Sequence, residues 1–361
     1  MNPFIARLRN GSIQALSYLL GGVVILSITF LCLRVPLGAG FSALWNGAIG
    51  NPKDGFWYPL SETFVETAPL LLTGLGVVIA WRAGMFSIGA EGQLLMGGAI
   101  ATVVWSLANR LPTPILIPLM LLAGSIAGGG WSAIAGWLRV RRNIPEVIST
   151  IMLNYIALSL VTWLVLGPLH GKGQSGPYSA PFPKSQMFPR PIPVSISDIQ
   201  TRFHLGVFVA FLVVPLIYLL LNRTRWGFGV RLLGQNEEAA RVAKFPVNRL
   251  RMGAMTLSGM LCGLAGTIEL LGVNGRLGSD FSAGWGYTAI PVALLGSLNP
   301  VGTLFSALFF GGLAAGCGNA EREQGVGVPS VVAYVIQAVI VLAIVGIRAW
   351  RQRKNGEEAT R

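Results

Sequence analysis

The sequence has few charged residues: 11% of its 361 residues are Asp, Glu, Lys or Arg, while 53% are hydrophobic. Ordinary soluble proteins carry roughly 25% charged residues. A chain with so little charge cannot cover a globular surface with polar groups. The shortage of charge therefore excludes a soluble protein and predicts a membrane protein.

Cysteine and histidine are also rare, with three and two residues respectively. Cys32, Cys262 and Cys317 all fall in apolar stretches without a pairing pattern, which predicts packing residues. His170 and His204 have no neighbouring residues at metal-ligand spacing. We therefore expect no disulfide framework, no bound metal and no other cofactor.

The chain also lacks a phosphate-binding loop. GKG at residues 171–173 has the wrong spacing for one, and no Ser or Thr follows its lysine. No other stretch comes closer, so we expect no ATP site within this chain. Energy for any transport must come from an ion gradient or from a partner protein.

Acidic residues are too sparse for several classes of membrane protein. Gradient-driven transporters usually carry ionisable residues deep in their helices, and here only Glu91 is expected well inside, because Glu62, Glu66 and Glu269 fall near outer helix ends. A membrane transferase needs clustered acids for a metal and a phosphate, and the adjacent acids at residues 237–238 point in different directions around a helix. The sequence therefore favours neither a gradient-driven transporter nor a membrane transferase.

Apolar stretches long enough to cross a membrane recur along the chain. A hydrocarbon core of about 30 Å needs roughly 20 residues per helix. A signal peptide is the alternative for the first stretch, because Arg7 and Arg9 precede it, but its length and the lack of a small-residue cleavage site favour a retained anchor. The predicted fold is an all-α polytopic membrane protein in which residues 1–361 form a single transmembrane domain. Its ten predicted spans, the eighth of them short, lie near residues 13–33, 63–80, 86–108, 113–138, 144–166, 204–222, 252–272, 286–299, 300–319 and 328–347.

Positive charge predicts the orientation of these spans, since Lys and Arg keep short loops cytoplasmic. With the N-terminus inside, 18 of the 27 Lys and Arg fall in cytoplasmic segments. Both termini and the 223–251 loop are then cytoplasmic, and the 167–203 loop is extracytoplasmic. The net charge of +13 follows from this topology and from contact with anionic membrane lipid. Nucleic acid is not an expected partner.

The 167–203 loop is rich in proline and glycine, which predicts irregular structure. It is either a simple connector or a docking surface for a protein that arrives from outside, and the sequence leaves both open.

The polar stretch NEEAARVAK at residues 236–244 predicts a short helix. Asn236 is a favourable N-cap, Glu237 and Glu238 suit the first turn, and Lys244 suits the last turn before a proline. A helix of this length is marginal alone, because isolated helices need roughly 12 to 15 residues. Another part of the assembly must therefore hold it.

Long motifs in the sequence resemble the transmembrane permease subunits of bacterial ATP-binding-cassette (ABC) importers. Within that superfamily, which includes ribose and branched-chain amino acid permeases, they are most similar to the nucleoside-type branch. The chain departs from the family's usual pattern at Ser87, where Asn is common, and at Lys244, where Gly is common. The motifs are ETAPLLLTGLGVVIAWRAGMFSIGAEGQLLMGGA (66–99), IPEVISTIMLNYIAL (144–158), GVRLLGQNEEAARVAKFPVNRLRMGAMTLSGMLCGLAGTIELLG (229–272) and GYTAIPVALLGSLNPVGTLF (286–305).

The resemblance implies a ten-helix fold that works as two permease subunits, homologous or identical, with two ATPase subunits and an extracytoplasmic solute-binding protein. Residues 236–244 match the short coupling helix that sits in a cleft of the ATPase. Ala239 and Ala240 offer this helix a small-residue face, and the alternative is a solvated loop helix. The predicted ATPase-docking residues are Arg231, Gly234, Asn236, Glu237, Glu238, Ala239, Ala240 and Arg241.

The predicted substrate path is carried by Glu91, Gln93, Asn154 and Tyr155. Glu91 and Gln93 lie in a glycine-rich stretch, residues 84–98, where a broken or closely packed helix is expected. Asn154 and Tyr155 lie near the middle of the fifth predicted span. Structural hydrogen bonding is the alternative role for the polar residues.

Two local patterns give further expectations. Asn143 and Glu146 resemble a capping box at the start of the fifth span. Ten spans also allow two five-helix halves in opposite orientation, with residues 89–98 and 289–298 as weakly similar counterparts. The glycine-rich SGMLCGLAG stretch at residues 258–266 suits close helix packing.

These observations predict a permease subunit of the bacterial plasma membrane that moves a small polar solute, with a nucleoside as the expected solute, while a separate ATPase hydrolyses ATP. The chain itself is then not an enzyme. The alternative is a self-sufficient secondary transporter or channel, which would transport solute without an ATPase.

Overall fold

The computed structural model describes residues 24, 27–28, 30–31, 35–51, 55–191, 201–322, 335 and 338–339. Its elements are helices, and the described residues include no β-strand longer than an isolated bridge. They separate into two compact units, each treated by itself: unit 1 holds Met1–Leu60 and Gly312–Arg361, and unit 2 holds Ser61–Gly311. The predicted all-α class is confirmed.

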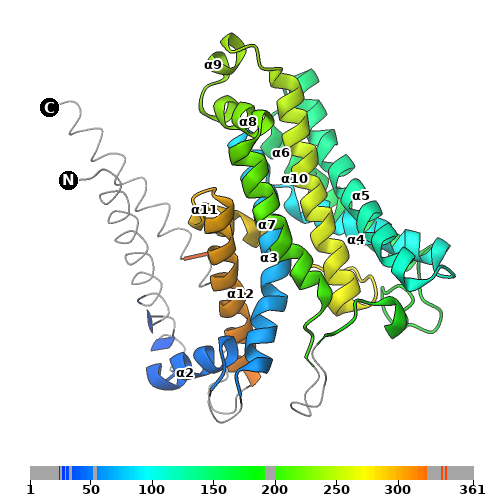
Figure 1. The fold of residues 1–361 in the computed structure, drawn as a ribbon. Coiled ribbons are helices and arrows are strands. Elements are labelled where there is room, and N and C mark those ends of the chain that lie inside the picture. The colour runs from blue at the N-terminus through cyan, green and yellow to red at the C-terminus, as the bar shows by residue number, and fades with distance from the viewer. Residues whose placement is uncertain are drawn as a thin grey trace. The chain divides into compact units, whose positions relative to one another are not determined.

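Unit 2 holds most of the described helices (Figure 1). Two of its helices, α3 and α12, continue into unit 1. In chain order the helices are α3 (Trp57–Arg82), α4 (Ala90–Ala108), α5 (Thr113–Arg142), α6 (Glu146–Leu166), η1 (Lys184–Gln186), α7 (Leu205–Arg223), α8 (Arg225–Gln235), α9 (Glu237–Val242), α10 (Val247–Glu269), its π-helical continuation η3 (Leu270–Asn274), α11 (Trp285–Leu295) and α12 (Pro300–Arg322).

Six of these helices are long and apolar enough to cross a membrane, namely α3, α5, α6, α7, α10 with η3, and α12. Each overlaps one predicted span. Helix α4 overlaps the predicted 86–108 span, and α11, with 11 residues, is short as expected for the 286–299 span. The predicted spans at 13–33 and 328–347 lie almost entirely outside the described residues.

Two helices were not expected from the sequence. One is α2 (Leu37–Ala48) of unit 1, and the other is α8, which the sequence analysis left inside a loop. Thr224 caps α8 by accepting a hydrogen bond of 3.0 Å from the Gly227 N–H. Both helices are too short to cross a membrane, so a search for long apolar runs does not find them.

Helices α5 and α10 pack at very short range through glycine. Gly124 and Gly128 on α5 face Gly259 and Gly263 on α10, and a Cβ added at Gly128 would overlap the backbone of Gly259 and Gly263. Small residues let helix backbones approach closely in membranes. The close packing expected for residues 258–266 is confirmed.

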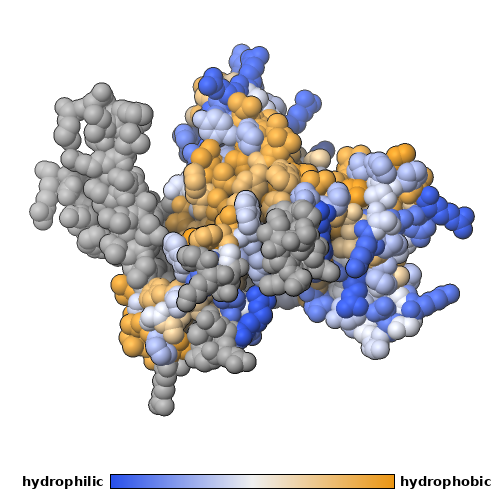
Figure 2. All heavy atoms as spheres, turned by 60° about the horizontal axis from the view of Figure 1, so that its bottom comes forward, coloured by the Kyte–Doolittle hydropathy of each residue, from blue (hydrophilic) through white to orange (hydrophobic). Residues whose placement is uncertain are grey.

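Helix α6 has large hydrophobic side chains that are exposed, including Ile148, Met152, Ile156 and Trp163. Only 28% of the most apolar window of this helix is buried. In Figure 2 hydrophobic side chains spread over the visible helix surface, while hydrophilic ones gather at its margins. Apolar exposure on this scale suits contact with lipid or with another transmembrane subunit.

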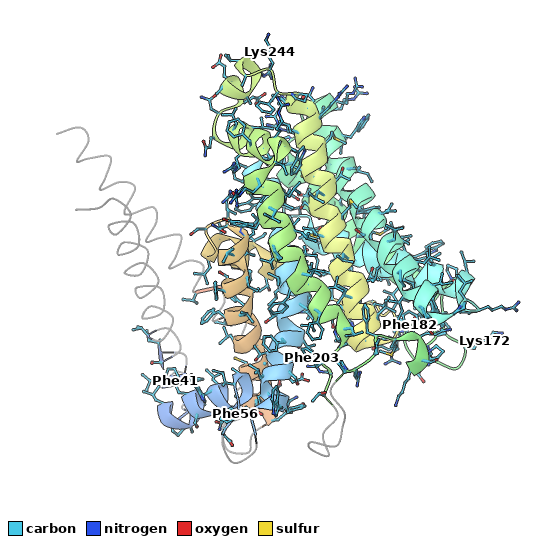
Figure 3. All side chains as sticks on the ribbon, viewed as in Figure 1. Phe41, Phe56, Lys172, Phe182, Phe203 and Lys244 are labelled. Atoms are coloured by element: carbon cyan, nitrogen blue, oxygen red, sulfur yellow. The ribbon has the colours of Figure 1, made fainter. Side chains whose placement is uncertain are left out.

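The two long loops of unit 2 lie at opposite ends of its helices. Figure 3 places Lys244, just after α9, at one end, and Lys172 and Phe182 at the other. We refer to these as the 223–251 end and the 167–203 end. Loops at opposite ends of spanning helices are exposed to opposite sides of a membrane.

Unit 1 brings α2 against the last part of α12. The Asn319 side chain donates a hydrogen bond of 3.3 Å to the Ala43 carbonyl. A Cβ added at Gly47 would overlap Asn319 and Gly316. The close contact between these helices therefore depends on glycine.

Candidate functional site

The chain is not helical between α3 and α4, where the sequence predicted a broken helix. In this segment the N–H of Phe86 donates to Glu146 Oε1 at 3.0 Å, and the N–H of Ile88 donates to Thr150 Oγ1 at 3.2 Å. Ser87 Oγ accepts from the Gly89 N–H at 3.2 Å. Backbone groups freed by the break thus find partners, and side chains of α6 supply two of them.

The predicted capping box at the start of α6 is wrong. Asn143 ends α5 in the left-handed region, with φ of 53°, and Pro145 is the N-cap of α6. Residues before proline favour extended backbone, so the chain between Asn143 and α6 does not form a capping turn. Glu146 instead holds the loop before α4 and forms an ion pair of 3.3 Å with Arg139.

Asn154 joins three elements through its side chain. Its Oδ1 accepts a hydrogen bond of 2.9 Å from the Gly92 N–H, and its Nδ2 donates to the Ile88 carbonyl at 2.9 Å and to the Tyr287 hydroxyl at 3.4 Å. The residue is 3% exposed. Both polar atoms of this amide are therefore used in holding the start of α4 and the first turn of α11.

Glu91 lies in the first turn of α4 and is 7% exposed. Its Oε2 accepts a hydrogen bond of 2.9 Å from the Gly286 N–H at the start of α11. A Cβ at Gly286 would overlap the Glu91 backbone, so glycine is needed for this approach. The carboxyl group thereby fixes where α11 meets α4.

These contacts surround a pocket of about 240 Å³. Two of its aromatic residues are well exposed, Tyr155 at 63% and Tyr287 at 48%. The residues that line it come from α4, α6, α11 and the loop before α11; they are Glu91, Leu95, Asn154, Tyr155, Leu158, Ser279, Ser282, Gly284 and Tyr287. The pocket thus combines aromatic rings, hydroxyl groups and one carboxyl group, with no Lys, Arg or His among its lining residues.

Three of the four predicted path residues, Glu91, Asn154 and Tyr155, meet at this pocket. The fourth, Gln93, is 1% exposed and does not line it, and its Oε1 is buried without a partner among the described residues. Their role in transport stays a prediction.

Sequence reasoning missed the second wall of the pocket. Ser279, Ser282 and Tyr287 come from GSDFSAGWGY, residues 278–287, which comprises the loop after η3 and the first turn of α11. The glycines and serines in this stretch indicate a break between two apolar helices. In a membrane, irregular backbone is tolerated where it is buried in protein or lines a cavity, and this rule could have identified the segment.

A cluster of ion pairs lies at the 167–203 end. Arg202, just before α7, pairs with Glu62 and, at 3.4 Å, with Glu66, one helical turn apart on α3. Burial lowers the pKa of the Arg202 guanidinium, but the hydrogen bond and ion pair with Glu62 outweigh that effect, so the pKa is raised. The sequence analysis placed Glu62, Glu66 and Glu269 near helix ends but did not anticipate their partner.

Next to this cluster, the His204 ring stacks on Phe188 with centroids 5.7 Å apart. Burial lowers the pKa of His204 to about 4, and Arg190 and Arg202 contribute. The ring is therefore uncharged at neutral pH.

The 167–191 segment is irregular, as expected, but it is folded onto η3 and the residues that follow it. The N–H groups of Ser179, Phe182 and Phe188 donate to the carbonyls of Leu277, Gly275 and Leu271, at 2.8, 2.7 and 3.1 Å. Trp105 at the end of α4 contacts the Phe182 ring, with centroids 4.5 Å apart. The segment is thus tied to the loop that leads to the pocket.

At the opposite end, Asn236 caps α9 by accepting a hydrogen bond of 3.0 Å from the Ala239 N–H, as predicted. The helix ends at Val242, before the predicted residue 244. Lys244 is outside the helix, in the left-handed region with φ of 59°. Glycine adopts this conformation at no steric cost, so the backbone at this position suits glycine better than lysine.

The predicted small-residue face of α9 is only partly available. Ala240 is fully buried within the chain, so it cannot contact another protein, while Ala239 is half-buried. Val242 is the residue that stands out, with 79% of its surface exposed. Val242, and not Ala240, is therefore the apolar side chain that α9 leaves exposed.

Glu237 forms an ion pair of 2.7 Å with Arg241 within α9, and a second of 2.5 Å with Arg251 that ties α9 to α10. Hydrogen bonds from Arg241 and Arg251 hold the pKa of Glu237 below its ordinary value. Glu238 is exposed. The helix that is too short to be stable alone is thus held partly by its own chain.

Arg231 and Gly234 lie on α8 rather than on α9. Arg231 is half-buried, and a Cβ at Gly234 would overlap the Arg82 carbonyl at the end of α3. Gly234 is exposed, and its lack of a side chain lets α8 approach the end of α3 closely.

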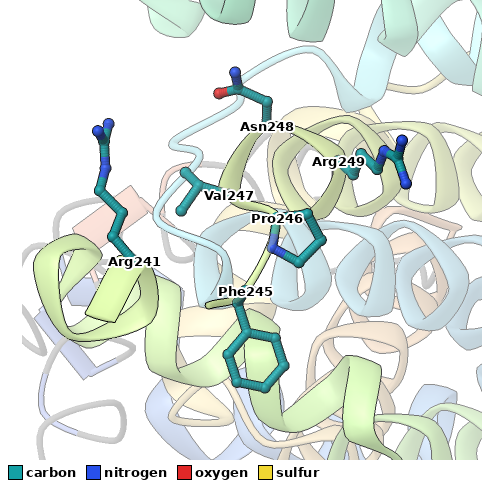
Figure 4. A pocket seen from close by; sticks show the side chains of 6 residues that line it. All are labelled: Arg241, Phe245, Pro246, Val247, Asn248 and Arg249. Atoms are coloured by element: carbon teal, nitrogen blue, oxygen red, sulfur yellow. The ribbon is translucent and has the colours of Figure 1, made fainter. Parts of the chain in front are cut away.

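A concave surface that encloses a volume of about 420 Å³ adjoins α9 (Figure 4). It is lined by Arg241, Phe245, Pro246, Val247, Asn248 and Arg249. Two arginines and an aromatic ring suit contact with an acidic protein surface.

Comparison with known proteins places these features in a family. Residues 60–345 match the family described as the permease component of the branched-chain amino acid transport system. The chain is 36% identical over 317 residues to the guanosine ABC transporter permease protein of Bacillus subtilis, which covers 87% of each chain.

Two further relatives carry different substrate names. The glucose ABC transporter permease protein of Haloferax volcanii is 35% identical over 309 residues, covering 83% of this chain and 79% of the relative. The nucleoside ABC transporter permease protein of Lactococcus lactis is 28% identical over 332 residues, covering 91% and 87%.

Proposed function

Because the chain belongs to the family of permease components of branched-chain amino acid transport systems, we propose that it is the transmembrane subunit of an ABC importer for a nucleoside. The chain is a transport component, and ATP hydrolysis belongs to a separate ATPase. The pocket between α4, α6 and α11 carries the substrate part of this proposal, because its two exposed tyrosines and its hydrogen-bonding groups suit a base joined to a sugar.

The proposed topology has ten transmembrane helices, with both termini in the cytoplasm of a bacterium and the chain in its plasma membrane. Six apolar helices and the distribution of Lys and Arg support it. The 223–251 end is then cytoplasmic, and the 167–203 end faces the binding protein. A five-plus-five inverted repeat remains part of the proposal.

The proposed assembly contains two permease subunits, two ATPase subunits and one solute-binding protein. Helix α9 and the concave surface beside it form the proposed ATPase contact. Their support is the exposed Val242, the arginines at residues 241 and 249, and the position of α9 at one extreme end of unit 2 (Figure 3).

Glucose is the second candidate solute, because the Haloferax volcanii relative with 35% identity is named for glucose. Sugars also hydrogen-bond to carboxyl groups and stack on aromatic rings, so the pocket suits glucose as well as a nucleoside.

Uptake into proteoliposomes that contain the permease, its ATPase and its binding protein separates the candidates. We expect an excess of adenosine or uridine to block uptake of a labelled nucleoside, and glucose to leave it unchanged. Uptake without the ATPase would instead indicate a secondary transporter or channel. Uptake of labelled glucose that nucleosides do not inhibit would refute the nucleoside assignment.

The ATPase contact is tested by Val242→Glu. We expect this variant to insert normally but to lose the ATPase during co-purification, because a charge replaces an exposed apolar contact. Lys184→Glu, at the other end of unit 2, is the control and should keep the ATPase bound. Ala240→Glu is unsuitable, because Ala240 is buried in its own chain. If Val242→Glu retains the ATPase, α9 is not the contact.

A further inference from the structure

We propose that Glu91 is a charge-selective residue, which admits solutes without negative charge and rejects their phosphorylated forms. This inference rests on the proposed function, since it assumes that the pocket lies on the solute path. It assigns separate roles to the polar residues of the pocket. Glu91 recognises the solute, while Asn154 positions the walls around it.

The first argument is the charge of the pocket. Glu91 is the only acidic residue that lines the pocket, and no Lys, Arg or His lines it. An anion in such a pocket loses water without gaining a positively charged partner, and this makes its entry costly. A phosphate group also approaches the Glu91 carboxyl group, which repels it when ionised.

The second argument is the hydrogen-bonding capacity of Glu91. A carboxylate has about four lone-pair sites, and the Glu91 carboxyl group accepts hydrogen bonds from the Gly286 N–H, on Oε2, and from the Ser282 side chain. Acceptor capacity therefore remains for N–H or O–H groups of a solute. Hydrogen bonds to an ionised acceptor are roughly twice as strong as neutral ones.

The third argument concerns Asn154. Its Oδ1 already accepts from the Gly92 N–H, and its Nδ2 donates to the Ile88 carbonyl and the Tyr287 hydroxyl. A solute could bond to this amide only by displacing these partners. Asn154 therefore acts as a positioning residue, which holds Tyr287 beside the pocket.

The rings of the pocket complete the recognition site. Tyr155 on α6 and Tyr287 on α11 keep about half or more of their surfaces exposed, at 63% and 48%. Exposed aromatic faces bind planar rings by stacking. A neutral planar solute with hydrogen-bond donors at its edge matches the carboxyl group and these rings together.

The test is equilibrium binding to the purified full-length permease in lipid nanodiscs, with adenosine, uridine and their 5′-monophosphates as probes. We expect each monophosphate to bind at least about 100-fold more weakly than its nucleoside, which corresponds to roughly 3 kcal/mol. Equal affinity of nucleoside and monophosphate for the wild-type chain would overturn the inference, and this measurement needs no variant.

Glu91→Gln then tests the residue itself. We expect nucleoside affinity to fall about tenfold, and the discrimination against the monophosphate to shrink by about the same factor. Glu321→Gln, an exposed glutamate at the end of α12, is the matched control and should bind like the wild type. An unchanged ratio in a stably folded Glu91→Gln variant would refute the role of Glu91.

A glucose and glucose 6-phosphate pair keeps this inference separable from the proposed function. Binding of glucose but not of nucleosides, with rejection of glucose 6-phosphate, would refute the nucleoside assignment and support the charge selectivity. Equal binding of nucleosides and their monophosphates would support the nucleoside assignment and refute the charge selectivity.

Discussion

Asn154 Oδ1 accepts a hydrogen bond of 2.9 Å from the backbone N–H of Gly92 and so joins the middle of α6 to the first turn of α4. The first N–H groups of a helix have no partner within it. In water a solvent molecule or a capping side chain would serve, but here the partner comes from a residue 62 positions away in the chain. The start of α4, and Glu91 with it, is therefore positioned by α6.

Replacing Asn154 by Ala should destabilise the permease and weaken solute binding. The change leaves the Gly92 N–H and the Ile88 carbonyl without their side-chain partners, and each unsatisfied buried group costs about 1 to 3 kcal/mol. Thermal unfolding in detergent and nucleoside binding measure the two effects. Ser159→Ala is the control, because Ser159 is exposed and its hydroxyl bonds only to the Tyr155 carbonyl on its own helix. Equal unfolding temperatures for Asn154→Ala and the wild type would contradict this account.

Gly128→Ala should lower stability by about 1 to 3 kcal/mol, the usual cost of overpacking. The added methyl group would overlap the backbone of α10 at Gly259 and Gly263. Gly130→Ala, on the same helix two residues later, is a close control because nothing lies within 4 Å of its Cβ position. Gly130→Ala should keep or gain stability, since Ala favours a helix more than Gly does. Unfolding of both variants in parallel gives the comparison, and similar losses in the two would show that contact with α10 is not responsible.

Arg202→Gln should loosen the 167–203 end. It leaves Glu62 and Glu66 without their guanidinium partner, at an expected cost of about 1 to 3 kcal/mol. That is less than the roughly 3 to 5 kcal/mol of a fully buried pair, because the Arg202 side chain is 41% exposed. Lys172→Gln in the same loop is the control. Increased cleavage of the 167–203 loop by a protease, together with a lower unfolding temperature, is the expected result for Arg202→Gln alone.

The tie between α9 and α10 should weaken in acid. Arg241 and Arg251 lower the pKa of Glu237 from its ordinary 4.5 in the folded chain. A lowered carboxylate pKa contributes stability above pH 4.5, and this contribution is lost as the pH falls through the folded-state pKa. Hydrogen exchange of α9 should therefore differ between the wild type and Glu237→Gln at neutral pH, and the difference should close in acid.

Glu238→Gln provides the matched control for this experiment. Glu238 is the next residue on α9, is exposed, and forms no ion pair within the described part of the chain. We expect its exchange to equal that of the wild type at every pH. A Glu238→Gln variant as labile as Glu237→Gln would mean that the acidic first turn, and not the ion pairs, protects α9.

Features that depend on short stretches of chain were predictable from the sequence. Six predicted spans overlap α3, α5, α6, α7, α10 and α12, because the need for about 20 apolar residues per crossing is local. The Asn236 cap was predictable for the same reason, since it bonds to an N–H three residues away. The glycines of residues 258–266 indicated close packing, although they did not identify α5 as the partner.

Features that depend on burial were harder to predict. The sequence suggested Ala239 and Ala240 as one docking face, but Ala240 packs inside its own chain. It suggested Gln93 as a path residue, but Gln93 is buried away from the pocket. A polar or small residue on a helix does not reveal which side of that helix faces protein, lipid or water.

The sequence by itself determined that this protein spans a membrane, that it is helical, and where most of its crossing helices lie, because apolar length and charge are properties of consecutive residues. Only the tertiary structure decided which helices meet and which side chains share a site. Glu91 and Gly286 are 195 residues apart, and Arg202 and Glu62 are 140 apart. In a uniformly apolar chain the helices differ little in hydrophobicity, so these pairings follow from close packing at glycines and from the need of each buried polar group to find a partner.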